Sequence, residues 1–171
     1  VPLVRPSLDG LLIAEIKRSS PSAGAIGAIT DPVSLAGAYI QGGAGMISVL
    51  TEELRFGGSL ADLMAVKEAH PQSAVLRKDF IQHPDEVDVA YRAGADAVLV
   101  ITAMFTSSPD AFETMQAIYA RALERGLLPL VEVHDAEEMA LARRLVPAPE
   151  LIGINARNLA TFRIDRNYPL A

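Results

Sequence analysis

The segment Leu11-Leu-Ile-Ala-Glu-Ile-Lys-Arg-Ser-Ser-Pro-Ser-Ala-Gly24 is the most informative part of the chain for its fold. It begins as an apolar run typical of a strand, carries two opposite charges, Glu15 and Lys17, and ends in a Ser-Pro-Ser turn. Because side chains alternate between the faces of a strand, these two charges share one face, and Ala14 and Ile16 take the other. An acid and a base on one face before a polar turn are typical of the edge of an active site; a solvent-exposed pair is the alternative.

Short apolar runs of this kind recur along the chain, and amphipathic segments separate most of them. The predicted strands cover residues 11–17, 46–50, 74–78, 97–101, 128–133 and 151–154. The predicted helices begin at residue 32, after the N-cap Asp31, and cover 59–69, 84–93, 108–125 and 135–145. Strands that alternate with helices indicate the α/β class with a parallel sheet.

Two architectures fit this alternation, an open doubly wound sheet and a (β/α)8 barrel. The length of 171 residues favours the open sheet, because a barrel typically needs about 250 residues. A weak internal repeat, Gly43-Ala-Gly-Met-Ile-Ser-Val-Leu against Gly94-Ala-Asp-Ala-Val-Leu-Val-Ile, supports a series of βα units. No linker divides the chain, so we expect one domain over residues 1–171.

The polar strand ends favour the barrel instead. Nearly every predicted strand ends in polar or ionisable residues, among them Lys78, Glu132 and Asn155. In a barrel these ends converge on one mouth, whereas in an open sheet they spread along an edge. Taken singly, Lys78 with Asp79 also fits a solvated turn, and His134 fits a helix cap or a structural hydrogen bond better than a ligand. Ser20-Pro21-Ser22 alone fits a plain turn.

The composition excludes several classes of protein. Half of the residues are apolar and the net charge is −6, which argues against a sequence-independent nucleic-acid binder. There is no cysteine, the three histidines lack metal-ligand spacing, and no dinucleotide fingerprint follows a strand. We therefore expect no metal and no membrane span, and with no signal-peptide core at the N-terminus we expect a cytoplasmic protein.

These motifs together resemble one family, indole-3-glycerol phosphate synthase. The matching blocks run in order along nearly the whole chain: Ala14-Glu-Ile-Lys-Arg-Ser-Ser-Pro-Ser, Ile47-Ser-Val-Leu-Thr-Glu, Phe56-Gly-Gly-Ser, Leu76-Arg-Lys-Asp-Phe-Ile, Gly94-Ala-Asp-Ala-Val-Leu, Leu130-Val-Glu-Val-His and Gly153-Ile-Asn-Ala-Arg-Asn-Leu. The resemblance implies a (β/α)8 TIM barrel of the ribulose-phosphate-binding type. We expect about six of its βα units here, without the N-terminal extension and the last two units of the family, as one incomplete domain.

The resemblance also implies a reaction, the decarboxylating and dehydrating ring closure of 1-(2-carboxyphenylamino)-1-deoxyribulose 5-phosphate in tryptophan biosynthesis, with no cofactor. It implies that Lys78 is the general acid, Lys17 binds the substrate carboxylate, Glu132 is a base, and Glu15 is a second carboxylate. Asn155 would orient substrate hydroxyls. The remaining implied contacts are Ser20, Pro21 and Arg157 on the phosphate side and Phe56, Phe80 and Leu99 around the aromatic ring.

Other functions stay open at this point. A shortened barrel without catalysis would bind an anionic ligand or take part in an assembly, with self-association or a partner covering the open barrel edges. Another phosphate-binding barrel enzyme is a weaker alternative, because the blocks around Lys78 and Glu132 do not fit it.

Overall fold

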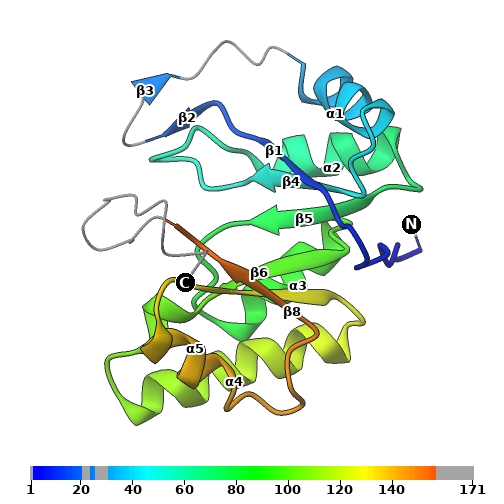
Figure 1. The fold of residues 1–171 in the computed structure, drawn as a ribbon. Helices are drawn as coiled ribbons and strands as arrows, with labels where there is room; N and C mark the ends of the chain where they lie inside the picture. The colour runs from blue at the N-terminus through cyan, green and yellow to red at the C-terminus, as the bar shows by residue number, and fades with distance from the viewer. Residues whose placement is uncertain (1, 21–23, 26–30, 157–171) are drawn as a thin grey trace.

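The computed structural model describes residues 2–20, 24–25 and 31–156, which form a curved parallel β-sheet with helices packed on one face (Figure 1). The strands of this sheet are β1 (Ile13–Ile16), β4 (Met46–Leu50), β5 (Ala74–Lys78), β6 (Ala97–Ile101), β7 (Leu128–Val133) and β8 (Leu151–Ile154). The helices are α1 (Pro32–Gln41), α2 (Leu60–Ala69), α3 (Pro84–Arg92), α4 (Pro109–Glu124), α5 (Ala136–Ala142) and the 3-10 turn η1 (Thr102–Phe105). Each predicted strand and helix is confirmed, although the first strand and the fifth helix are shorter than predicted.

The order of the strands distinguishes between the two architectures. The sheet runs β1-β4-β5-β6-β7-β8, which is the order of the chain, and every neighbouring pair is parallel. A doubly wound sheet has a point where the strand order reverses, and the described residues contain none. Since right-handed crossovers that always advance in one direction put every helix on the same face, the sheet curls into part of a barrel.

Side-chain alternation divides the interior into two cores. The larger core lies between the sheet and the helices and takes the outward-facing strand residues, among them Ile47, Val75, Val98 and Val131. The smaller core lies on the concave inner face and comprises Met46, Ala74, Leu76, Ala97 and Leu128. Val4 and Leu11, from the segment before β1, pack against the smaller core. This segment covers the end of the sheet opposite to the carboxyl ends of the strands.

The local signals in the sequence behave as expected. Asp31 caps α1 by accepting from the N–H groups of Val33 and Ser34 at 3.0 Å. In the repeat, Gly43 and Gly94 follow α1 and α3 with φ of 94° and 91°, a conformation that glycine adopts without steric cost. The repeated Gly-Ala step therefore marks two equivalent returns from a helix to the next strand.

One small element was not predicted from the sequence. After β1, the two-residue strands β2 (Ser19–Ser20) and β3 (Gly24–Ala25) pair antiparallel, outside the main sheet. The backbone N–H of Ser19 also donates to the carbonyl of Phe56 at 3.2 Å. This segment therefore joins the segment between β4 and α2, a long-range contact that local sequence does not encode.

Candidate active site

The carboxyl ends of the strands bring the predicted acidic and basic residues to the inner face of the sheet. Ala14 and Ile16 pack in the outer core, so Glu15 and Lys17 face inward, as their alternation predicts. Val131 and Val133 lie in the same outer core, which turns Glu132 inward on β7. Charged side chains from strands that are far apart in the sequence thus lie together at the carboxyl end of the curved sheet.

Glu15 is the centre of the first group of charges. Its carboxylate lies 2.5 Å from Nζ of Lys17 and 3.0 Å from Nζ of Lys78. Lys78 belongs to β5, which is separated from β1 by β4, so the contact crosses the concavity of the sheet. The alternative of an isolated solvent-exposed pair on β1 is therefore wrong.

The charges in this group are only partly exposed to solvent. The exposed fractions of the side chains are 28% for Glu15, 29% for Lys17 and 32% for Lys78. Burial raises the pKa of Glu15, but the charge of Lys78 and the hydrogen bonds from both lysines outweigh it, and the pKa lies below its usual value of 4.5. Glu15 is accordingly a carboxylate at neutral pH, and the two ammonium groups remain accessible to an anionic ligand.

A second polar group joins β7 to the residue that follows β8. The amide nitrogen Nδ2 of Asn155 donates to Glu132 at 3.0 Å, and Nδ1 of His134 lies 2.8 Å from the backbone oxygen of Asn155. The N–H of His134 donates to the carboxylate of Glu138 at 2.7 Å. His134 therefore has the structural hydrogen bonds that its sequence position indicates, and it supports the pair formed by Glu132 and Asn155.

Glu138 itself is nearly buried at the start of α5 and has an unusual charge environment. Burial raises its pKa above the ordinary value, the nearby charge of Asp135 adds to this, and the bond from His134 opposes it. It is a buried glutamate beside the site that sequence reasoning did not select, because its position resembles an ordinary first-turn helix residue.

The aromatic residues named by the sequence also come together. The rings of Phe56 and Phe80 lie 6.1 Å apart between centroids, tilted by 42°, within the range of favourable ring pairs. Leu99 is 2% exposed and faces the inside of the sheet, because Val98 and Val100 pack in the outer core. Two rings from separate loops and one inner-face leucine thus provide apolar surface near the carboxyl ends of the strands.

Two glycines explain how Phe56 reaches this place. Gly57 has a φ of 61°, which favours glycine. A Cβ on Gly58 would lie 2.4 Å from the backbone oxygen of Leu50, so a side chain has no room there. The Gly-Gly pair allows the loop to fold tightly against the end of β4. This tight fold explains why the Phe56-Gly-Gly-Ser block needs glycine at both positions.

The predicted phosphate side lies mostly outside the described residues. Pro21 and Arg157 lie outside the described residues, and so does the side chain of Ser20, whose backbone forms part of β2. The arrangement of the predicted phosphate side therefore stays a prediction. In the neighbouring loop, Arg18 forms an ion pair with Asp62 of α2.

The described ranges contain no cluster of three or more acidic, histidine or cysteine side chains that could hold a metal ion. Over the same residues, no helix has the length and hydropathy needed to span a membrane.

The sheet and the position of the charges define the class of protein, a (β/α) barrel with its polar groups at the carboxyl ends of the strands. Solved structures agree with this fold. 3-Hexulose-6-phosphate synthase from Salmonella typhimurium superposes with a TM-score of 0.58 at 21% identity, covering 85% of this chain and 63% of that one. A mandelate oxidase complex superposes at 0.52 and 16% identity, covering 72% and 46%.

The sequence comparisons then define the family. The family model of indole-3-glycerol phosphate synthase matches residues 5–169, and the chain belongs to this family, whose fold is the (β/α)8 barrel. Indole-3-glycerol phosphate synthase 1 of Streptomyces coelicolor is 47% identical over 171 residues, covering 95% of this chain and 61% of that protein. The synthase of Streptomyces griseus is 50% identical over 157 residues, covering 91% and 55%. The chain thus spans about three fifths of the length of these relatives.

Proposed function

We propose that this chain carries the catalytic strands of an indole-3-glycerol phosphate synthase, a decarboxylating lyase of tryptophan biosynthesis. The observation that supports this most directly is the group of Glu15, Lys17 and Lys78, in which two partly exposed ammonium groups share one carboxylate. A substrate with a carboxylate and a phosphate needs cationic partners, and ring closure needs a positioned acid.

The first step forms a carbon–carbon bond between the ring carbon that bears the carboxylate and the carbonyl carbon of the deoxyribulose chain. In this proposal Lys78 protonates the carbonyl oxygen as that bond forms, and the oxygen becomes a hydroxyl. Lys17 holds the carboxylate, which leaves as carbon dioxide, and its bonding electrons restore the aromatic ring. The ion pairs of both lysines with Glu15 orient the two side chains before the substrate arrives.

The second step removes water and completes the indole ring. An acid must protonate the hydroxyl as it leaves, and a base must accept a proton from the substrate. We assign the base to Glu132, whose carboxylate is oriented by the amide of Asn155, and we give Glu15 the role of second carboxylate. Asn155 has the further role of orienting substrate hydroxyls.

We assign the rest of the substrate to the neighbouring loops. Phe56, Phe80 and Leu99 would contact the aromatic ring, in keeping with the 6.1 Å between the two phenylalanine rings. Ser20, Pro21 and Arg157 would contact the phosphate. A cytoplasmic location is part of the same proposal and is compatible with a sequence that contains no cysteine.

Turnover tests the proposal directly. The protein is incubated with the carboxyphenylamino-deoxyribulose phosphate, and the fluorescence of the indole product and the release of carbon dioxide are followed together. We expect one carbon dioxide for each indole. A folded protein that binds the substrate without turnover would support the non-catalytic alternative and overturn the proposal.

A matched pair of glutamates sharpens this experiment. Glu132→Gln keeps an acceptor for Asn155 but removes the charge, so we expect kcat to fall by about 100-fold. Glu138→Gln changes the buried glutamate that contacts His134 but keeps an acceptor for its N–H, so it should leave kcat within about twofold of the wild-type value. Equal losses in the two variants would contradict the role of Glu132.

A further inference from the structure

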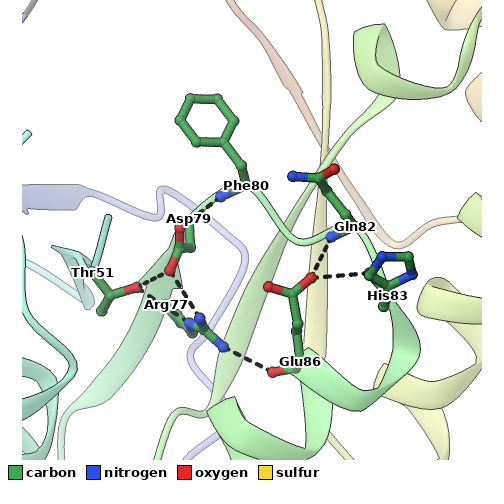
Figure 2. A network of polar contacts seen from close by, with 7 residues as sticks. All are labelled: Thr51, Arg77, Asp79, Phe80, Gln82, His83 and Glu86. Carbon is green, nitrogen blue, oxygen red and sulfur yellow. Dashed lines mark hydrogen bonds and ion pairs between the residues drawn. The ribbon is translucent and has the colours of Figure 1, made fainter. Parts of the chain in front are cut away.

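A buried polar network surrounds the end of β5, next to Lys78. The guanidinium of Arg77 lies 2.8 Å from Oδ2 of Asp79 and donates from Nε to Oγ1 of Thr51 at 3.2 Å (Figure 2). The hydroxyl of Thr51 donates to the same Oδ2 at 2.6 Å. Arg77 is 8% exposed and Thr51 is 5% exposed. The interpretation of Lys78 and Asp79 as a solvated turn is therefore wrong.

This network lies on the opposite side of the strand from the charges of the candidate site. Arg77 occupies the outward-facing position between two inward-facing residues, Leu76 and Lys78. Its third contact is from Nη1 to the backbone oxygen of Glu86 in α3, at 2.8 Å. The carboxylate of Glu86 accepts from the N–H of Gln82 at 2.6 Å. The network thereby connects the end of β4, the end of β5, the loop after it and the first turn of α3.

Two contacts of the network hold the backbone of proposed functional residues. The second carboxylate oxygen of Asp79 accepts from the N–H of Phe80 at 2.9 Å. The carbonyl oxygen of Lys78 accepts from the N–H of Thr51 at 3.0 Å. Figure 2 shows the ring of Phe80 pointing away from the network while its backbone nitrogen faces Asp79. Asp79 therefore sets the direction in which the chain turns after β5.

The proposed chemistry requires this turn to be fixed. Lys78 reaches Glu15 at 3.0 Å, and Phe80 faces Phe56 at 6.1 Å between ring centroids. Both contacts start from the two residues that flank Asp79. A displacement of about 1 Å in a reacting group can cost about 100-fold in rate, so a rigid turn at this point has a direct effect on the acid.

We propose that Asp79, held by Arg77 and Thr51, is a positioning residue that fixes the backbone of Lys78 and Phe80 for the ring-closure reaction. This inference rests on the function proposed above. Charge-assisted hydrogen bonds are shorter and stronger than neutral ones. A buried ion pair as a whole adds little net stability compared with an apolar pair of similar size, although removal of one partner alone is costly. The network accordingly acts on the geometry of the transition state more than on folding or on the binding of the ground state.

The first test compares two aspartates that each accept from arginine. Asp79→Asn keeps the size of the side chain but weakens its bonds to Arg77 and Thr51. We expect kcat to fall by about 10- to 100-fold while KM changes by less than about threefold. The matched control is Asp88→Asn, because Asp88 accepts from Arg121 and Arg125 between α3 and α4, on the outer side of the sheet. The kcat of Asp88→Asn should stay within about twofold of the wild-type value.

A second pair of variants keeps the test decisive where Asp79→Asn fails to fold. Thr51→Val removes the hydroxyl at nearly constant volume, and Thr51→Ser keeps it. We expect Thr51→Val to lower kcat by about tenfold, because it removes one hydrogen bond to the carboxylate of Asp79. Thr51→Ser keeps this bond and should retain kcat within about twofold of the wild-type value. A folded Thr51→Val or Asp79→Asn protein with the wild-type kcat overturns the inference.

A spectroscopic measurement separates this inference from the proposed function. The five phenylalanines are replaced biosynthetically by 4-fluorophenylalanine, and the ¹⁹F signal of Phe80 is assigned with Phe80→Leu. Asp79→Asn and Thr51→Val should shift or broaden this signal, and Asp88→Asn should not. If the wild-type protein has no turnover, the proposed function fails, and an unchanged Phe80 signal in both variants then overturns the positioning inference as well.

Discussion

Two lysine–carboxylate pairs at opposite ends of β5 differ mainly in their exposure to water. At the start of the strand, Nζ of Lys67 lies 2.8 Å from Asp96, and the side chains are 3% and 0% exposed. At the end of the strand, Nζ of Lys78 lies 3.0 Å from Glu15, with side chains 32% and 28% exposed. Similar atoms at similar distances therefore lie in different environments, and access to solvent distinguishes the two pairs.

The buried pair has its hydrogen bonds directed into the protein. Lys67 also donates to two backbone carbonyl oxygens, at 3.1 and 3.3 Å. Asp96 accepts from the N–H of Val75 at 2.8 Å and from that of Val4 at 2.7 Å. This pair connects α2, β5 and the segment before β1, and its burial leaves no access for a ligand. The pair at the other end has the opposite property and is the one suited to chemistry.

The largest effect that we predict is the loss of stability on breaking the buried pair. Lys67→Met leaves the carboxylate of Asp96 buried without its cation, which should lower the free energy of unfolding by about 3–5 kcal/mol. Urea unfolding followed by circular dichroism measures this. The double variant Lys67→Met/Asp96→Asn should lose less than the sum of the two single variants. A loss below about 1 kcal/mol for Lys67→Met would show that burial does not make this pair more important for stability than the partly exposed pair.

A smaller effect is expected at the partly exposed pair of Lys78 and Glu15, and it depends on pH. The folded-state pKa of Glu15 lies below the usual 4.5, so the unfolded state binds the proton more tightly. The stabilisation by Glu15 is then complete above about pH 4.5 and is lost as the pH falls through the folded-state pKa. Glu15→Gln should cost about 1 kcal/mol at pH 7, and this difference should shrink towards pH 3 in urea titrations.

Glu138→Gln is the control for this prediction, because the sign is reversed. The pKa of Glu138 is raised in the folded protein, so its contribution to stability is favourable in acid and is lost as the pH rises through the folded-state pKa. The variant should therefore become more stable relative to the wild type as the pH rises. If both glutamine variants respond to pH in the same direction, the assignment of these two environments is incorrect.

The smallest effect is expected at a pair in which both side chains are exposed. Arg5 lies 2.6 Å from Glu150, and the side chains are 46% and 60% exposed. Such pairs contribute about 0–1 kcal/mol, so Arg5→Ala should change the midpoint of thermal unfolding by no more than a few degrees. A loss as large as that of Lys67→Met would show that distance, and not exposure, determines the value of these pairs.

Much of the fold could be predicted because its signals are local. Apolar runs bounded by caps such as Asp31 gave the strands and helices, and the alternation around Glu15 gave the inner face. Short β2 and β3 could not be predicted, since two-residue strands have no periodicity of their own and depend on contacts such as that of Ser19 with Phe56. Length and alternation alone left two architectures open, whereas the polar strand ends and the family resemblance favoured the barrel, which the strand order confirms.

The site could be predicted only in part, because local patterns do not encode contacts between distant segments of the chain. Alternation placed Glu15 and Lys17 on one face, but it could not reveal that Lys78 reaches across β4 to the same carboxylate. Nor could it show that Arg77 and Asp79 bind Thr51, which lies 26 and 28 residues earlier in the chain. Hydrogen bonds between distant segments depend on how the sheet curves, and no local pattern reports that curvature.

The central claim is that the exposed pair at the end of β5 performs chemistry while the buried pair performs none. It is tested most directly by the kcat of Lys78→Met, measured with its free energy of unfolding. We predict a fall in kcat of about 10²- to 10⁴-fold, with a change in unfolding free energy within about 1 kcal/mol. A stably folded Lys78→Met protein that turns over substrate at the wild-type rate would contradict the account.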